Sequence, residues 1–97
     1  AVKWFRLAAE KGNAVAMTNL GNMYRDGKGV AKDHAEAVKW YRLAAEKGNA
    51  VAMNNLGIVY ERGEGVTKDI EQAVTWYRQA GESGHEKALA NLKRLGR

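Results

Sequence analysis

Three asparagines recur at one repeated position and are the side chains best suited to hydrogen-bond a ligand. Asn19, Asn55 and Asn91 follow one another at intervals of 36 residues. A primary amide offers both a carbonyl acceptor and an NH2 donor, so a row of amides can bind the backbone of an extended peptide with little regard to its sequence. The alternative is that these amides form hydrogen bonds between neighbouring helices and hold the stack in register.

The other reactive residues form no catalytic or metal-binding pattern. Ser83 and His85 are close in sequence, but no third group is placed to orient them as a nucleophile and its base. His34 and His85 fall in different repeats, and a zinc site needs several converging ligands. Residues 27–29 read Gly-Lys-Gly but lack the flanking sequence of a phosphate-binding loop. We therefore expect no enzymatic activity, no cofactor, no metal and no small-molecule substrate.

The three asparagines belong to a repeat that runs through the whole chain. Residues 1–36 and 37–72 are identical at 25 of 36 aligned positions, and residues 73–97 form a shorter third copy. A fixed period of this length is typical of repeat arrays, in which each unit buries its apolar face only against its neighbours. Fewer than three full copies predict marginal stability, and a start within the apolar pattern suggests a segment of a longer array.

Each copy has the signals of two helices joined by a glycine-containing loop. Asn49 and Asp69 are suited to cap helix N-termini, and Gly63 is suited to end a helix in the left-handed conformation. The apolar residues between these signals follow helical spacing, without proline or strand-like alternation. The pattern predicts six helices at about 1–11, 14–26, 34–47, 50–62, 70–82 and 85–95, in one domain divided into 1–12, 13–48, 49–84 and 85–97.

Two glycines inside predicted helices indicate close packing. Gly21 and Gly57 each cost a helix about 1 kcal/mol relative to alanine. We expect the compensation to be a close helix contact beside Trp40 or Trp76, within a recurring aromatic stripe that forms the core.

The two ends of the array are expected to differ. Trp4 and Phe5 at the N-terminal edge should be partly exposed, and self-association could occur there. In the third copy Lys93 stands where the first two copies have glycine, so residues 85–97 are expected to form a capping helix with a polar outer face.

Charge and composition narrow the classes of partner. The net charge is +5, but acidic and basic residues alternate except at the basic C-terminal end. We therefore expect no nucleic-acid partner, and weak binding of anionic surfaces remains an alternative. The absence of cysteine excludes a disulfide framework, and no apolar stretch is long enough for membrane insertion. The composition is compatible with a bacterial cytoplasm or periplasm, and with a consensus design.

The chain resembles the Sel1-like repeat, a relative of the tetratricopeptide repeat, in the motif Asn-Ala-x-Ala-Met-x-Asn-Leu-Gly-x-x-Tyr-x-x-Gly-x-Gly-Val-x-Lys-Asp followed by Ala-Val-x-Trp-Tyr-Arg-x-Ala-Ala-Glu-x-Gly. The resemblance implies an all-α, right-handed α-α superhelix, or solenoid. It also implies an adaptor or scaffold for protein complexes, as in bacterial secretion, envelope and host-interaction systems or eukaryotic membrane-protein degradation. The alternative function is a structural spacer without a dedicated ligand.

In such solenoids the first helix of each pair lines the concave face, which here means residues 14–26, 50–62 and 85–95. Positions pointing away from the packing stripe are the predicted contacts to a protein or peptide: Thr18, Asn19, Asn22, Arg25, Asn54, Asn55, Ile58, Glu61, Lys87, Asn91 and Arg94. Some tetratricopeptide domains bind a C-terminal carboxylate at these positions. Asn19, Asn55 and Lys87 fit that pattern, whereas Val15 and Asn91 replace its cations.

Overall fold

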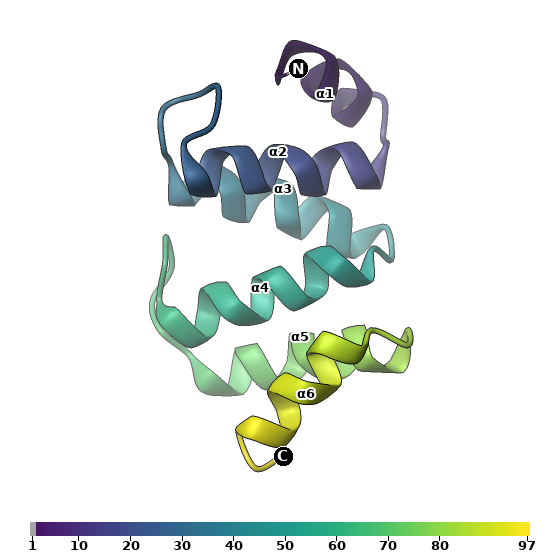
Figure 1. The fold of residues 1–97 in the computed structure, drawn as a ribbon, viewed down its shortest axis with the longest axis vertical. Helices are drawn as coiled ribbons and strands as arrows, with labels where there is room; N and C mark the ends of the chain where they lie inside the picture. Colours follow the sequence, from purple (N-terminus) through teal and green to yellow (C-terminus); the bar gives the residue numbers. More distant parts are fainter. Residues whose placement is uncertain (1) are drawn as a thin grey trace.

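The computed structural model describes residues 2–97 as helices joined by short loops (Figure 1). The helices are α1 (Val2–Glu10), α2 (Ala14–Asp26), α3 (His34–Glu46), α4 (Ala50–Arg62), α5 (Ile70–Glu82) and α6 (Glu86–Arg94). The six predicted helices are confirmed, with bounds that differ by one residue at most. Ala1, which the sequence pattern assigns to the first helix, lies outside the described residues.

The helix ends follow the local signals in the sequence. The Asn49 side chain accepts a hydrogen bond from the backbone amide of Ala52 at 2.9 Å, and Asp69 accepts one from the amide of Gln72 at 3.1 Å. Each bond satisfies a first-turn donor that has no partner within its helix. Gly63 ends α4 with φ of 72°, a conformation that glycine adopts without steric cost. The preceding repeat uses the same three caps.

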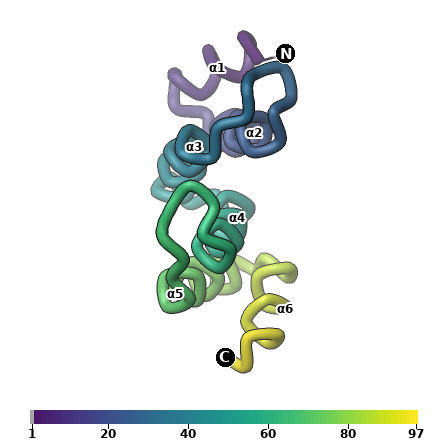
Figure 2. The backbone as a smooth tube through the Cα atoms, turned by 90° about the vertical axis from the view of Figure 1, so that its left-hand side faces the viewer, coloured from purple at the N-terminus to yellow at the C-terminus, as the bar shows by residue number. Residues whose placement is uncertain are grey.

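The helices stack in sequence order and give an elongated molecule of 40 × 24 × 16 Å. Every extensive helix contact joins two helices that are consecutive in the chain, most of all α2 with α3 and α4 with α5. Figure 2 shows α2, α4 and α6 along one side of the stack and α3 and α5 along the other. The expected α-solenoid is thus confirmed, and α2, α4 and α6 together can form one continuous surface.

The closest helix contacts are made by the two glycines inside α2 and α4. A Cβ atom on Gly57 would lie 2.4 Å from Cε1 of Tyr77, and one on Gly21 would lie 2.5 Å from Cε1 of Tyr41. Both tyrosines are fully buried. Glycine therefore creates the space in which each tyrosine ring crosses from the second helix of a pair onto the first.

The tryptophans do not make this glycine contact, which corrects the expectation for Trp40 and Trp76. Successive residues of a helix are rotated by about 100°, so the residue after each tryptophan faces the glycine instead. Trp40 is nevertheless buried, with 8% of its surface exposed, and Trp76 is half-buried. Trp4 at the N-terminal edge is 63% exposed, as predicted. Of the three tryptophans in the aromatic stripe, only Trp40 is therefore buried in the core.

Thr18 and Asn54 are buried, although their shared repeat position was expected to point away from the packing stripe. The Thr18 hydroxyl donates to the carbonyl of Ala14 at 3.0 Å, within its own helix. The Asn54 side chain accepts a hydrogen bond from the Asn91 amide at 3.0 Å, from α4 to α6. At Asn54 this position faces the first helix of the following repeat, which covers it.

Candidate functional site

The surface formed by α2, α4 and α6 contains two adjoining hollows. The larger, of about 360 Å³, is lined by Asn22, Arg25, Val51, Asn54, Asn55, Ile58, His85 and Lys87. The smaller, of about 250 Å³, is lined by Phe5, Asn19, Asn22, Met23, Asp26 and Lys28. Asn22 lines both, so the two hollows adjoin at this residue of α2. We refer to the two together as the groove.

Most of the predicted contact residues lie in this groove. Those that line it are Asn19, Asn22, Arg25, Asn54, Asn55, Ile58 and Lys87. Glu61, Asn91 and Arg94 do not line it and instead bond to one another or to Asn54. Thr18 lines neither hollow.

Several lining residues were missed by the sequence analysis. Phe5 comes from α1 and Lys28 from the loop after α2, which the periodicity of one helix does not place in the groove, whereas Met23 and Asp26 lie in α2 itself. His85 carried a usable signal, because it replaces the capping asparagine of the other two copies. Its side chain makes no capping hydrogen bond to α6. The imidazole lines the larger hollow instead.

Side-chain amides link the first helices of successive repeats. Asn55 donates from Nδ2 to Oδ1 of Asn22 at 3.4 Å, and Asn91 donates to Oδ1 of Asn54. The alternative in which repeated asparagines bond between helices is therefore realised for Asn55 and Asn91. Asn22 also accepts a hydrogen bond from the Tyr41 hydroxyl, so both lone pairs of its oxygen are used within the array.

The two buried tyrosine hydroxyls find acceptors at different repeat positions. Tyr41 donates to Asn22, whereas Tyr77 donates to Oε1 of Glu61 at 2.8 Å. Ile58 stands at the position of Asn22 and cannot accept, and Glu61 stands at the position of Arg25. Burial raises the pKa of Tyr41 to about 12, so its hydroxyl remains a donor at neutral pH. The exchange of acceptors keeps each buried hydroxyl satisfied while the groove surface changes from polar to apolar.

Glu61 ties α4 to the two helices that follow it in the chain, α5 and α6. Its Oε1 accepts from Nη2 of Arg94 in α6 at 2.7 Å, as well as from Tyr77 in α5. The Arg94 guanidinium, aided by the Tyr77 hydroxyl, holds the pKa of Glu61 below its ordinary value of 4.5. Arg97 forms a second ion pair, with Glu71 at 3.1 Å. Arg94 and Arg97 therefore both form ion pairs within the array. This pairing weakens the alternative that the basic C-terminal end binds anionic surfaces.

Acid is expected to destabilise the array partly through Glu61. Because its pKa is lower in the folded chain, the ionised carboxylate contributes stability above pH 4.5, and this contribution is lost as the pH falls through the folded-state pKa. We expect a small effect, since Arg94 is largely exposed to solvent. When the pH is lowered from about 6 to about 3, the thermal midpoint should fall less for Glu61→Gln than for the unsubstituted chain. Equal falls would contradict this role.

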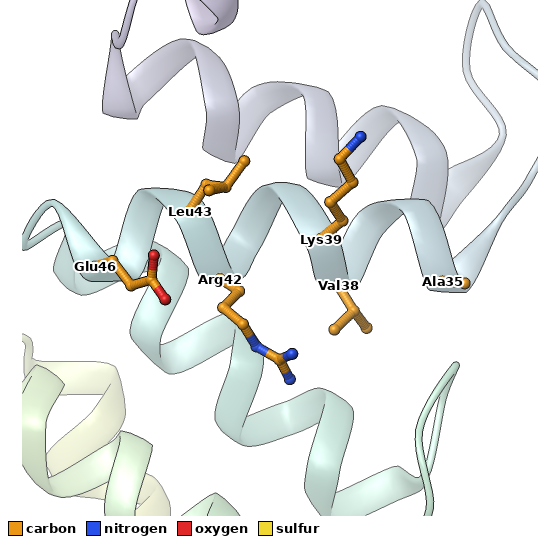
Figure 3. Close-up of a pocket in the computed structure, with 6 residues that line it drawn as sticks. All are labelled: Ala35, Val38, Lys39, Arg42, Leu43 and Glu46. Atoms are coloured by element: carbon orange, nitrogen blue, oxygen red, sulfur yellow. The ribbon is translucent and has the colours of Figure 1, made fainter.

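The opposite side of the array carries a hollow of about 320 Å³ that belongs to one helix. It is lined by Ala35, Val38, Lys39, Arg42, Leu43 and Glu46 of α3. Figure 3 shows Lys39 and Leu43 on one flank of α3 and Val38 and Arg42 on the other. Arg42 donates from Nη2 to the Tyr60 hydroxyl at 2.6 Å, and so links α3 to α4. This surface is a suitable control for the groove.

Within residues 2–97, no three His, Asp or Glu side chains gather in a way that suits a metal ion. None of the helices from α1 to α6 has the length and apolarity that a membrane span requires. The Ser83 hydroxyl donates to the backbone carbonyl of Gln79 at 3.3 Å.

Comparisons with known proteins give a consistent family relationship. A family model described as Sel1 repeat matches residues 1–13, 14–49 and 50–85. A Sel1 repeat protein from Oxalobacter formigenes is 43% identical with a TM-score of 0.88, over 94% of this chain and 37% of that one. A protective antigen present in uropathogenic Escherichia coli strains, described as displaying an SLR fold, is 43% identical with a TM-score of 0.90, over 98% of this chain and 21% of that one.

A third solved structure is similar over most of its own length. Helicobacter pylori cysteine-rich protein B is 30% identical with a TM-score of 0.89, over 94% of this chain and 68% of that one. The chain thus spans well under half of the first two proteins, although it aligns with all three almost end to end. A comparison with curated proteins found no significant match to this chain.

Proposed function

Because the chain belongs to the Sel1 repeat family, whose members are generally protein-interaction scaffolds, we propose that it binds an extended segment of a partner protein in the groove. The observation that carries this proposal is the larger hollow, which draws its lining from α2, α4 and α6. A surface built from three successive repeats can follow an extended chain, whereas the hollow on α3 belongs to a single helix.

The chemistry of the groove supports a binding role. Sel1 repeat proteins are typically non-catalytic, and the lining combines side-chain amides and basic groups with the aliphatic Val51 and Ile58. Amides and cations fix the orientation of a peptide, and aliphatic side chains supply apolar contact area.

Capture of a partner tests the proposal. The triple variant Asn19→Ala/Asn55→Ala/Lys87→Ala removes three polar contacts from the groove and should weaken capture from a lysate of the source organism about tenfold or more, since few residues dominate a typical interface. Circular dichroism checks that the variant is folded, because Asn55 also bonds to Asn22.

A matched variant on the α3 surface provides the control. Lys39→Ala/Leu43→Ala/Glu46→Ala replaces three lining residues of the opposite hollow and should leave capture unchanged. Loss of capture with this variant alone would refute the groove proposal.

A second candidate function is self-association through the α1 edge. Trp4 and Leu7 are both more than half exposed there, and Phe5 is only half-buried. An apolar edge of this kind favours contact with another helix. Light scattering tests this candidate: a mass that rises with protein concentration would support self-association, and a monomer at high concentration would contradict it.

A further inference from the structure

We infer that the larger hollow of the groove selects acidic partner segments, because its charged lining residues are basic and its lining contains no carboxylate. This inference rests on the proposed function and names the chemistry of the segment that would occupy the groove. Three features of the larger hollow carry it: the charges that line it, the orientation of its amides and the place of its aliphatic residues.

The charges in the larger hollow favour an anion. The cationic Arg25 and Lys87 line it beside His85, and none of its lining residues is Asp or Glu. Lys87 forms no ion pair with any residue in the described range 2–97. Arg25 donates to the Asp26 carboxylate from Nε and Nη2, which leaves its Nη1 for another acceptor.

The hydrogen-bond network uses the oxygens of Asn22 and Asn54 as acceptors, whereas Asn55 is turned the other way and donates from its NH2 group. The oxygen of Asn22 accepts from both Tyr41 and Asn55, and the oxygen of Asn54 accepts from Asn91. The oxygens of Asn22 and Asn54 are therefore used within the array, and the NH2 group of Asn22, the more exposed of the two residues, donates to no residue among 2–97. A ligand rich in acceptors, such as a carboxylate-bearing peptide, complements these donors.

Ile58 and Val51 add an apolar contact beside the donors. Both line the same hollow as Lys87. The fitting segment therefore has acidic residues next to an aliphatic residue. The carboxylates would lie against the basic and amide groups, and the aliphatic side chain would lie against Ile58.

Two capped peptides test the selectivity. The acidic probe is acetyl-Ser-Asp-Leu-Glu-Asp-Leu-Ser-amide, and its neutral isostere is acetyl-Ser-Asn-Leu-Gln-Asn-Leu-Ser-amide. Titrations followed by ¹H–¹⁵N NMR measure dissociation constants near 1 mM, where one short segment is expected to bind. The acidic probe should bind about tenfold more tightly and shift the side-chain signals of Asn22 and Asn55. A neutral probe with a free C-terminal carboxylate distinguishes capture of a chain end from capture of acidic side chains.

Asn22→Asp reverses the polarity without removing the acceptor. Its carboxylate can still accept from Tyr41 and Asn55, so the fold is retained, but the NH2 donors are lost and a negative charge is added. The acidic probe should lose affinity about tenfold, and the neutral isostere should not. Lys87→Gln should lower the affinity for the acidic probe about three- to tenfold, whereas Lys39→Gln on the opposite side should leave that affinity unchanged.

The outcomes separate this inference from the proposed function. Equal affinity for the two probes, with shifts confined to the groove, would overturn the acidic selectivity and leave groove binding in place. No groove shift with about 5 mM acidic probe would also overturn the selectivity, and the capture experiment would then decide the proposed function by itself. An acidic preference that responds equally to Lys39→Gln and Lys87→Gln would reflect net charge alone and would refute the inference.

Discussion

Replacing Trp40 by alanine is expected to destabilise the array by about 3–5 kcal/mol. Trp40 is 8% exposed and belongs to the hydrophobic core, so truncation removes buried apolar surface and leaves a cavity between packed helices. A small domain has only about 5–15 kcal/mol of stability in total, so much of the population should unfold at moderate temperature. Urea and thermal unfolding followed by circular dichroism measure the loss.

The repeat supplies a matched control for this substitution. Trp4 occupies the same repeat position as Trp40 but is 63% exposed. Trp4→Ala should therefore cost less than about 1 kcal/mol, as is usual for surface positions. Equal losses at the two positions would mean that the helices do not pack as described.

Replacing Gly57 by alanine is expected to lower stability by about 1–3 kcal/mol, although helix propensity alone predicts a gain of about 1 kcal/mol. The new methyl group would lie 2.4 Å from a ring carbon of Tyr77, which is fully buried and has no space into which to move. The helices must then separate. Because the propensity effect would raise the thermal midpoint and the steric effect would lower it, the direction of the change in midpoint shows which effect dominates.

Gly81 provides the corresponding control. A Cβ atom there would lie 2.7 Å from Cδ2 of Leu89, an exposed and flexible side chain that can turn aside. The other two copies have Ala9 and Ala45 at this position. Gly81→Ala should therefore leave the thermal midpoint unchanged or raise it. A gain at Gly57 similar to that at Gly81 would contradict the close contact with Tyr77.

The local parts of this fold could be predicted because their causes lie close together in the sequence. Asn49 caps α4 through an amide only three residues away, and Gly63 ends the same helix by its own backbone conformation. The 36-residue period then fixes the order of the helices, because each repeat can bury its apolar face only against the next. The resemblance to Sel1-like repeats led to the same architecture, and the family match confirms it.

The errors arise where a contact depends on the angle between two helices. Helical spacing identifies an apolar face but does not say whether Trp76 or Tyr77 will meet Gly57 across it. The same uncertainty concealed the burial of Asn54, because its partner Asn91 lies 37 residues away. Sequence spacing limits such choices to adjacent positions, and only packing selects between them.

The groove was predictable as a surface but not as a hydrogen-bond network. The repeated asparagines identified the helices that form it, yet the amide orientation follows from Tyr41, which belongs to another helix. The exchange of acceptors between Asn22 and Glu61 was likewise invisible. Each substitution looks like variation on an exposed face until the tyrosine hydroxyl that it serves is known.

Site-specific photo-cross-linking tests most directly whether a partner lies in the groove. A benzoylphenylalanine introduced in place of Ile58 lies in the larger hollow, and one in place of Leu43 lies on the opposite surface of α3. After capture from a lysate of the source organism and irradiation, we predict a cross-linked partner from position 58 and none from position 43. A cross-link from position 43 alone, with both variants folded by circular dichroism, would contradict the account.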